Sequence, residues 1–311
     1  MTDLILHHYP QSPFAEKARL MLGFKGLAWH SVMIPAVMPK PDLTALTGGY
    51  RRTPVLQIGA DIYCDTALIA RRLEREKATP ALFPEGKEAA AAGLAQFADQ
   101  VLFQHGVAIN FQPKGLAARF AGAPEAMVQG FMADRKALFS GGTASRLDSA
   151  VALSQWPALI GRLETQLDRD GEFLLGDQAC VADFAHYHAL WFVASNKAVA
   201  EVLEGYPAVK AWMARMADFG HGSSTAMESA EAIRIANEAT PESMPATDFV
   251  SPGGFAAGQQ VTVSAVDYGT EEVAGKLVFE DAEEIVISRE DERAGLVQVH
   301  FPRYGFKISA A

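Results

Sequence analysis

Residues 4–22 read LILHHYPQSPFAEKARLML, and this stretch decides the fold of the first third of the chain. The apolar run 4–6 has the length and composition of a short buried strand. Ser12 suits the N-cap of a helix, and Pro13 suits the first helical position, where the backbone amide has no partner in any case. Apolar residues three and four apart then continue to Leu22. The pattern predicts a strand followed closely by a helix.

The sixty residues that follow continue the alternation of short strands and helices. Residues 27–34 predict a second strand, and residues 53–58 and 62–64 predict two more around a Gly-Ala-Asp turn. Asp65 then caps a helix that runs to about Lys77. The order strand, helix, strand, optional helix, strand, strand, helix indicates a small α/β domain, which we place at residues 1–80.

Two further regions differ from the first in their hydrophobic period. Residues 85–240 are rich in Ala, Leu and Met at helical spacing, which predicts an all-helical domain. Its expected helices are 86–110, 124–140, 145–170, 182–197, 198–219 and 225–239. A linker rich in Pro and Gly follows, at 240–245 and 251–254. Beyond it the period becomes two, and about five short strands predict a small β-barrel of the SH3-like kind at residues 250–311. The fold class is therefore α+β multidomain.

Composition and charge exclude several functions. The chain has 311 residues, with 27 basic and 37 acidic side chains and a formal charge of −10. This charge excludes nucleic acid as a partner, because binding to a phosphate backbone depends on basic surface. Residues 1–80 are the only positive region, with 10 basic and 7 acidic side chains, and so fit a small anionic ligand.

The cysteines, histidines and apolar runs exclude other classes. The two cysteines are far apart, which argues against a disulfide framework or a structural zinc site. His186 and His188 are two residues apart on an expected helix and point to different faces, so we expect no metal. No run of about 18 apolar residues exists, so we expect no membrane association and a cytoplasmic location.

Taken together, residues 3–240 resemble a cytosolic glutathione S-transferase. The order and spacing of five segments carry the resemblance: Tyr9–Phe14, Arg52–Leu56, Asp65-Thr66, Leu82–Pro84 and Phe173–Asp183. The resemblance implies a thioredoxin-like domain that binds glutathione as co-substrate, an all-helical second domain and a homodimer. The C-terminal β-module lies outside it.

Ser12 occupies the position at which the family activates glutathione. The resemblance implies that its hydroxyl hydrogen-bonds the sulfur. Only the thiolate is a nucleophile, and a free thiol has a pKa of about 8.5, so a helix N-terminus and a hydroxyl donor would favour the reactive form. Ser12 can also be a simple N-cap, and Tyr9 is a second hydroxyl candidate. Some members have cysteine here and attack disulfides; serine cannot, which favours conjugation.

The resemblance also implies contacts to the rest of the tripeptide. Thr53 and Pro54 resemble the family's cis-proline turn, whose backbone binds the cysteinyl unit. Asp65 and Thr66 resemble the pair that binds the γ-glutamyl group. Arg52, or alternatively Arg51, would bind the glycyl carboxylate. All these contacts precede residue 70, so we expect the β-module to have no part in glutathione binding. We also expect the β-module to pack on the helical domain.

The leading hypothesis is an enzyme, a transferase that activates glutathione for attack on a small apolar electrophile near Phe14, Phe103 and Phe111. A non-catalytic glutathione-binding or interaction protein is the alternative, which the β-module favours because small barrels commonly recognise partners. A third hypothesis is another glutathione-dependent reaction on the same scaffold: ether cleavage, isomerisation or peroxide reduction.

Overall fold

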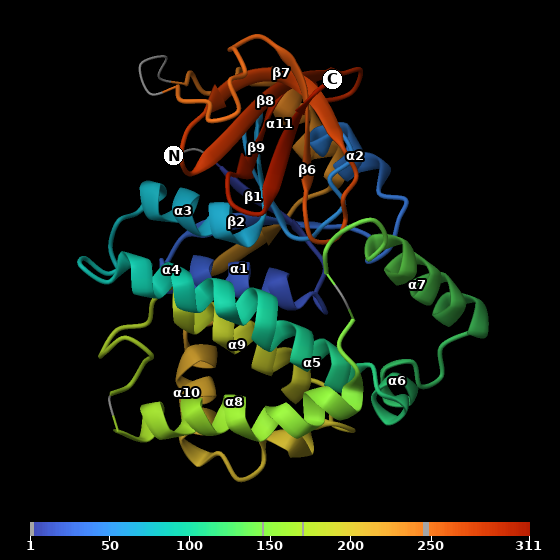
Figure 1. Ribbon diagram of the computed structural model, residues 1–311. Coiled ribbons are helices and arrows are strands. Elements are labelled where there is room, and N and C mark those ends of the chain that lie inside the picture. The colour runs from blue at the N-terminus through green and yellow to red at the C-terminus, as the bar shows by residue number, and fades with distance from the viewer. Residues whose placement is uncertain (1–2, 145, 170, 245–248) are drawn as a thin grey trace.

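The computed structural model describes residues 3–144, 146–169, 171–244 and 249–311. Residues 145 and 170, the ends of one expected helix, and part of the expected linker, 245–248, lie outside the described residues. Figure 1 shows the strands gathered at one end of the molecule and most of the helices at the other. None of the described helices is both long and apolar enough to cross a membrane.

The first region has the thioredoxin-like arrangement that the sequence predicts. Strand β1 pairs with β2 in parallel and with β3 antiparallel, and β4 pairs antiparallel with β3. Helix α1 begins at Pro13, directly after its Ser12 N-cap. The elements are β1 (Leu4–His8), α1 (Pro13–Phe24), β2 (Ala28–Met33), α2 (Pro41–Thr47), β3 (Val55–Ile58), β4 (Asp61–Cys64) and α3 (Thr66–Glu76).

The second region is helical, with α9 buried at its centre. Trp212 of α10 is fully buried, and its indole nitrogen donates to Asp183 of α9 at 3.0 Å. The elements are α4 (Glu88–Phe97), the π-helical turn η1 (Ala98–Leu102), α5 (Phe103–Asn110), α6 (Pro113–Arg119), α7 (Glu125–Leu138), α8 (Ser149–Arg169), α9 (Val181–Ala194), the 3₁₀ turn η2 (Ala200–Leu203), α10 (Pro207–Asp218) and α11 (Ser229–Glu238).

Two elements of this region differ from the expectation. Helix α6 is a short helix that begins at Pro113, where the sequence analysis placed no element. Residues 223–226 form strand β5 (Ser223–Ala226), which pairs in parallel with β2, whereas the sequence analysis placed no element at 223–224 and expected residues 225–226 to begin the helix 225–239. Its four exposed small residues carry no strand pattern, so only the neighbouring strand reveals it.

The C-terminal β-module contains the five strands that its period of two predicts. Strand β10 returns to pair with β6, so the five strands form one sheet. The elements are β6 (Gln260–Ala265), β7 (Val273–Glu280), β8 (Glu284–Asp291), β9 (Gly295–Pro302) and β10 (Phe306–Ala310).

The β-module is joined to the thioredoxin-like sheet, which the sequence analysis did not foresee. Strand β9 pairs in parallel with β4, so Ile62 lies opposite Val299. Within the described residues the sheet therefore has ten strands, in the order β10-β6-β7-β8-β9-β4-β3-β1-β2-β5. Val55 and Ile62 share one apolar cluster with Val299 and Phe301. The module thus packs mainly on the first region, and reaches the helices through contacts such as that of the Gly269 amide with the Leu138 carbonyl, at 2.6 Å.

His300 lies at the seam between β9 and β4. Its Nδ1 is 2.6 Å from Oε1 of Glu284, its Nε2 is 2.9 Å from Oδ1 of Asp61, and its ring stacks on Tyr63. Burial by itself lowers the pKa of this imidazole, but the hydrogen bonds to Asp61 and Glu284 outweigh burial and raise the pKa of His300. The imidazolium therefore stabilises the junction between the two regions.

This cluster predicts a stability that falls as the pH rises. Because the pKa of His300 is higher in the native state than in the unfolded state, its charge contributes fully to the free energy of unfolding below the unfolded pKa of about 6.5. This contribution is lost as the pH rises through the native pKa. The difference in melting temperature between wild type and His300→Gln should shrink from pH 6 to pH 9 in thermal unfolding. His30→Gln is the control, because His30 is only half-buried. A difference that stays constant across this range would contradict the assignment of the charge.

Candidate functional site

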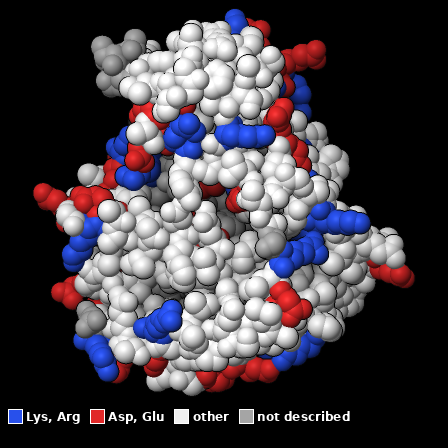
Figure 2. All heavy atoms as spheres, in the orientation of Figure 1, with Lys and Arg blue, Asp and Glu red and all other residues white. Residues whose placement is uncertain are grey.

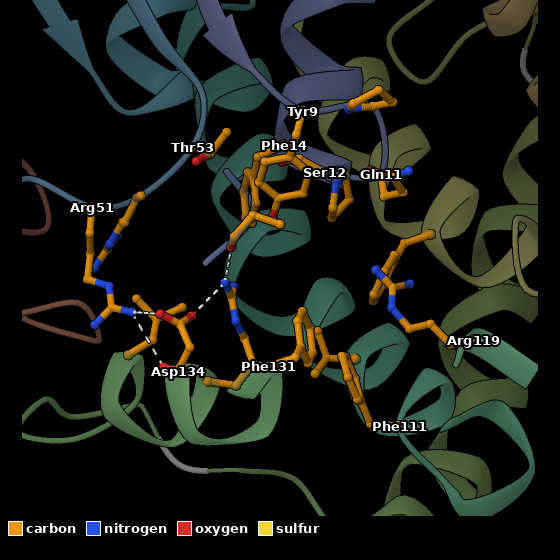
Figure 3. Close-up of a pocket in the computed structure, with 18 of the residues that line it drawn as sticks. Tyr9, Gln11, Ser12, Phe14, Arg51, Thr53, Phe111, Arg119, Phe131 and Asp134 are labelled. Atoms are coloured by element: carbon orange, nitrogen blue, oxygen red, sulfur yellow. Dashed lines mark hydrogen bonds and ion pairs between the residues drawn. The ribbon is translucent and has the colours of Figure 1, made fainter. Parts of the chain in front are cut away.

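A large cavity lies where the thioredoxin-like region meets α5, α6 and α7. Its volume is about 810 Å³, which is typical of small-molecule sites. Figure 2 shows the surface hollowed between the β-rich and helical ends, with Lys and Arg side chains nearby. Figure 3 shows Tyr9, Gln11, Ser12 and Phe14 along one side, Arg51 and Asp134 at one end, and Arg119 and Phe111 at the other.

Ser12 combines a capping role with a place in this cavity. Its Oγ accepts a hydrogen bond from the Ala15 amide at 3.2 Å, and the residue is 2% exposed. No other hydrogen bond of this hydroxyl occurs among the described residues, so its proton remains available for an acceptor in the cavity. The N-terminus of α1 adds the positive end of a helix dipole at the same point.

A buried arginine fixes the loop that carries Tyr9 and Ser12. The guanidinium of Arg19 donates to the Pro10 carbonyl at 3.0 Å and to the Glu16 carboxylate at 2.6 Å. Glu16 lies in turn 3.0 Å from His221. The loop is therefore held by a charged network behind the cavity, which the sequence analysis did not detect.

The peptide bond between Thr53 and Pro54 is cis, as the resemblance implies. The hydroxyl of Thr53 accepts a hydrogen bond from Nζ of Lys40 at 2.9 Å, and Lys40 also donates to the Arg51 carbonyl at 3.1 Å. Both partners are neutral, so no carboxylate among the described residues neutralises the ammonium directly. Burial, aided by the charge of Arg135, lowers the pKa of Lys40 to about 8. Lys40 is a cation of the site that the sequence analysis missed.

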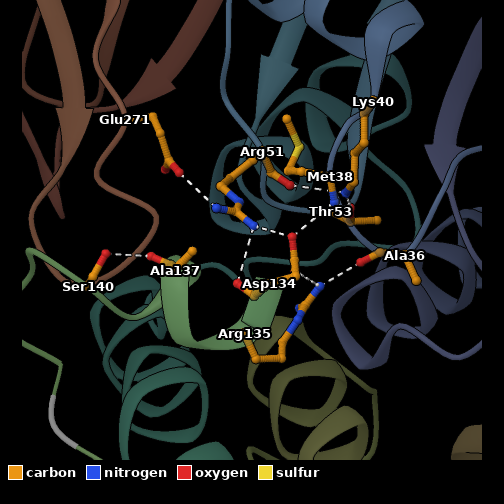
Figure 4. A network of polar contacts seen from close by, with 10 residues as sticks. All are labelled: Ala36, Met38, Lys40, Arg51, Thr53, Asp134, Arg135, Ala137, Ser140 and Glu271. Atoms are coloured by element: carbon orange, nitrogen blue, oxygen red, sulfur yellow. Dashed lines mark hydrogen bonds and ion pairs between the residues drawn. The ribbon is translucent and has the colours of Figure 1, made fainter. Parts of the chain in front are cut away.

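Arg51 is committed to an ion-pair network between the regions (Figure 4). Its guanidinium donates to the Asp134 carboxylate at 2.5 Å and to Glu271 of the β-module at 2.9 Å. Asp134 also pairs with Arg135, whose guanidinium donates to the Ala36 carbonyl. Helix α7 is thereby tied to the thioredoxin-like region across the cavity.

Arg52 is also engaged, and by the β-module. It forms an ion pair with Asp267, and its Nε donates to the Tyr268 carbonyl at 3.1 Å. The guanidinium lies 3.8 Å from the centre of the Tyr268 ring, and Asp65 is 3.9 Å away. Tyr268 also lines the cavity, although the sequence analysis places every contact with glutathione before residue 70.

Asp65 faces a second, smaller cavity of about 270 Å³, which Lys17 and Asp99 also line. Asp65 caps α3 through a hydrogen bond from the Ala67 amide at 2.9 Å and has a φ of 74°. This backbone region is strained for a residue other than glycine, and such strain tends to occur at functional sites. Phe14, Arg52 and Tyr268 line both cavities and so lie at the boundary between them.

The structure thus divides the predicted site residues into three groups. Ser12, Thr53 and Arg52 line the large cavity, together with the alternative Arg51. Asp65 lines the small one, and Pro54 and Thr66 line neither. Phe14, Phe103 and Phe111, the expected apolar residues, line the large cavity. Within the described residues, no group of three or more His, Cys, Asp or Glu could hold a metal ion.

This fold and cavity place the chain in the glutathione S-transferase class, and the comparisons with known proteins agree. A family model described as glutathione S-transferase, N-terminal domain, matches residues 6–81, and one described as glutathione S-transferase, C-terminal domain, matches residues 144–218. A GST-like protein from Pseudomonas syringae has a solved structure that is 50% identical, with a TM-score of 0.84 over 100% of both chains. The chain belongs to the glutathione S-transferase family.

More distant structures share the fold alone. A glutathione S-transferase from Rhodospirillum rubrum F11 is 20% identical, with a TM-score of 0.53 over 69% of this chain and 87% of its own. FzlA from C. crescentus is 20% identical, with a TM-score of 0.51 over 69% and 87%. No curated protein matches the sequence.

Proposed function

We propose that the chain is a glutathione transferase that joins the sulfur of glutathione to a small electrophile with an apolar body. The observation that carries this proposal is the uncommitted hydroxyl proton of Ser12, at the N-terminus of α1 and in the large cavity. The thiol loses its proton to solvent, and the thiolate accepts the Ser12 hydrogen bond. The new carbon–sulfur bond forms as the leaving group departs with its electron pair.

The rest of the tripeptide is assigned by the charges that remain unpaired. Lys40 binds the glycyl carboxylate, because its ammonium lies beside Thr53 and its hydrogen-bond partners among the described residues are neutral. Arg52 and Arg51, the residues that the sequence suggests for this role, already pair with carboxylates. Asp65 and the N-terminus of α3 at Thr66 bind the γ-glutamyl ammonium and carboxylate, with Arg52 and Tyr268 between them and Ser12.

The lowered pKa of Lys40 predicts that affinity for the tripeptide falls above pH 8. An ammonium with a pKa of about 8 loses its charge there, so binding of S-hexylglutathione, which has no thiol to titrate, should weaken several-fold between pH 7 and pH 9.5. Lys40→Arg keeps its charge throughout, so its affinity should fall only by the smaller amount that deprotonation of the ligand's own amino group causes in both proteins. Calorimetric titration measures both; an equal loss of affinity in wild type and Lys40→Arg would remove Lys40 from the site.

A glutathione-binding protein without turnover is the second candidate. Two features favour this candidate. Arg51 and Arg52 are held in ion pairs, and Tyr268 lies between the two cavities, so both features reduce the space that is open to a second substrate. Calorimetry with S-hexylglutathione, followed by mass spectrometry of products from a panel of electrophiles, separates the two. Conjugates above the uncatalysed level support the transferase; binding without conjugates supports the second candidate.

The homodimer, the cytoplasmic location and the division at 1–80, 85–240 and 250–311 stay proposals. The first two regions carry charges of opposite sign, which suits a contact between subunits.

A further inference from the structure

We propose that the electrophile of the large cavity carries an anionic group on an aromatic body, and that Arg119 binds this anion. The inference deepens the proposed function and rests on it, since it names the class of co-substrate for the same cavity.

Arg119 is an unpaired cation in the wall of the cavity. It ends α6, is half-buried, and has no hydrogen bond or ion pair with any residue that the structure describes. Three other arginines that line the cavity, Arg51, Arg52 and Arg135, each pair with a carboxylate. An unpaired guanidinium in a partly desolvated place costs free energy, which an anionic ligand would recover.

Aromatic rings hold this guanidinium without neutralising it. Its central carbon lies 5.3 Å from the ring centre of Phe192 and 5.9 Å from that of Phe111. Contacts of this kind orient the planar group and leave its hydrogen-bond donors free for a carboxylate or sulfonate. Burial, and the charge of Arg135, lower the pKa of Arg119, although the group stays charged at neutral pH.

Two of the cations in the cavity wall, Lys40 and Arg119, have no carboxylate partner among the described residues, whereas Arg51 and Arg52 also pair with Glu271 and Asp267 of the β-module. Five cationic side chains line the cavity: Lys40, Arg51, Arg52, Arg119 and Arg135. Asp134 is the one carboxylate among its described lining residues, and Arg51 and Arg135 share it. Lys40 is assigned to glutathione near Thr53, whereas Arg119 lies at the other end from Arg51 and Asp134 (Figure 3). Arg119 is therefore the cation that remains for an anionic group on the second ligand.

The rings next to Arg119 favour a flat apolar body for that molecule. Phe111 stacks on Phe131 of α7, with 6.2 Å between ring centres and 13° between planes, and both rings line the cavity. Helices α6 and α7 lie between the stretches that match the family models, 6–81 and 144–218. The Arg119 end is thus built by a part of the chain that those models do not cover.

Fluorescence titration of the full chain without glutathione tests the inference directly. The probes are 1-anilinonaphthalene-8-sulfonate, which is anionic, and N-phenyl-1-naphthylamine, its neutral counterpart. Arg119→Gln should weaken binding of the anionic probe about 10- to 100-fold, the usual effect of losing a hydrogen bond to a charged group, and change the neutral probe less than about twofold. Arg119→Lys should keep part of the affinity. Arg162→Gln, an exposed site on α8, is the matched control and should change neither.

Each outcome either supports or overturns the role of Arg119. Equal weakening of both probes would make Arg119 a structural residue and overturn the proposal, as would unchanged binding of the anionic probe. With glutathione added, Arg119→Gln should lower kcat/KM for 4-chloro-3-nitrobenzoate more than for neutral 1-chloro-2,4-dinitrobenzene. If wild type conjugates neither compound, the transferase proposal fails, while the titration without glutathione still decides whether Arg119 binds anions.

Discussion

Replacing Ser12 by alanine should lower kcat/KM for glutathione conjugation about 10²–10⁴-fold, the usual contribution of a well-placed proton-handling group. The hydroxyl occupies the N-terminus of α1 with its proton uncommitted among the described contacts, so its loss removes the donor that stabilises the thiolate. Initial rates of conjugate formation over a range of electrophile concentrations at saturating glutathione, measured on wild type and variant, give kcat/KM for each.

Two further variants separate chemistry from capping. Ser12→Ala also removes an N-cap worth about 1 kcal/mol, so its melting temperature should fall slightly. Ser12→Thr keeps a hydroxyl and a cap and should retain most of the rate. A lower melting temperature with an unchanged rate for the alanine variant would reduce Ser12 to a cap. Ser12→Cys should create thiol–disulfide exchange; its absence would mean that this position is not aimed at the glutathione sulfur.

Replacing Phe301 by alanine should cost about 3–5 kcal/mol of unfolding free energy and destabilise both sheet regions together. Phe301 is fully buried in the β-module, and its ring contacts Phe306 and Tyr50, which belongs to the thioredoxin-like region. Because the two regions share one apolar cluster, circular dichroism and denaturant titration should show one transition, shifted as a whole.

Tyr304→Ala is the matched control for this prediction. Tyr304 is 67% exposed in the same module, so its replacement should change the unfolding free energy by less than about 0.5 kcal/mol. A Phe301→Ala protein that unfolds in two steps, with the thioredoxin-like region unaffected, would show that the β-module is a separable unit.

Because the two regions share one apolar cluster, removal of residues 250–311 should destabilise the thioredoxin-like region and remove Tyr268 from the cavity wall. This result would be contrary to the expectation from sequence that glutathione binding would survive.

Local patterns account for the part of the fold that the sequence predicts. The strand before Ser12, the helix after it and the five strands of the β-module follow from hydrophobic period and capping residues, which act within a few positions. The pairing of β9 with β4 joins residues that are far apart in the chain, and no local signal records it. Strand β5 was missed for the same reason, since Ser223–Ala226 is a strand only because β2 lies beside it.

In the candidate site too, the sequence predicts residues that lie in recognisable local segments and misses those that depend on tertiary neighbours. Ser12 and Thr53 were predicted because they lie in recognisable segments, and both line the cavity. Whether a cation is available to a ligand depends on its tertiary neighbours, so the sequence pointed to Arg52, which pairs with Asp267, and missed Lys40 and Arg119. Tyr268 was missed because a strand connection in the β-module returns to the cavity.

The junction of β4 with β9 has a consequence for the chain as it leaves the ribosome. Strand β4 ends at residue 64, but its partner is not complete until residue 302. At about 5–20 residues per second, roughly 12–48 seconds of translation separate the two strands. During that interval the thioredoxin-like region has an open strand edge, which can pair with other chains. We therefore expect ribosome-bound chains stalled before residue 295 to need chaperone protection that the released protein does not.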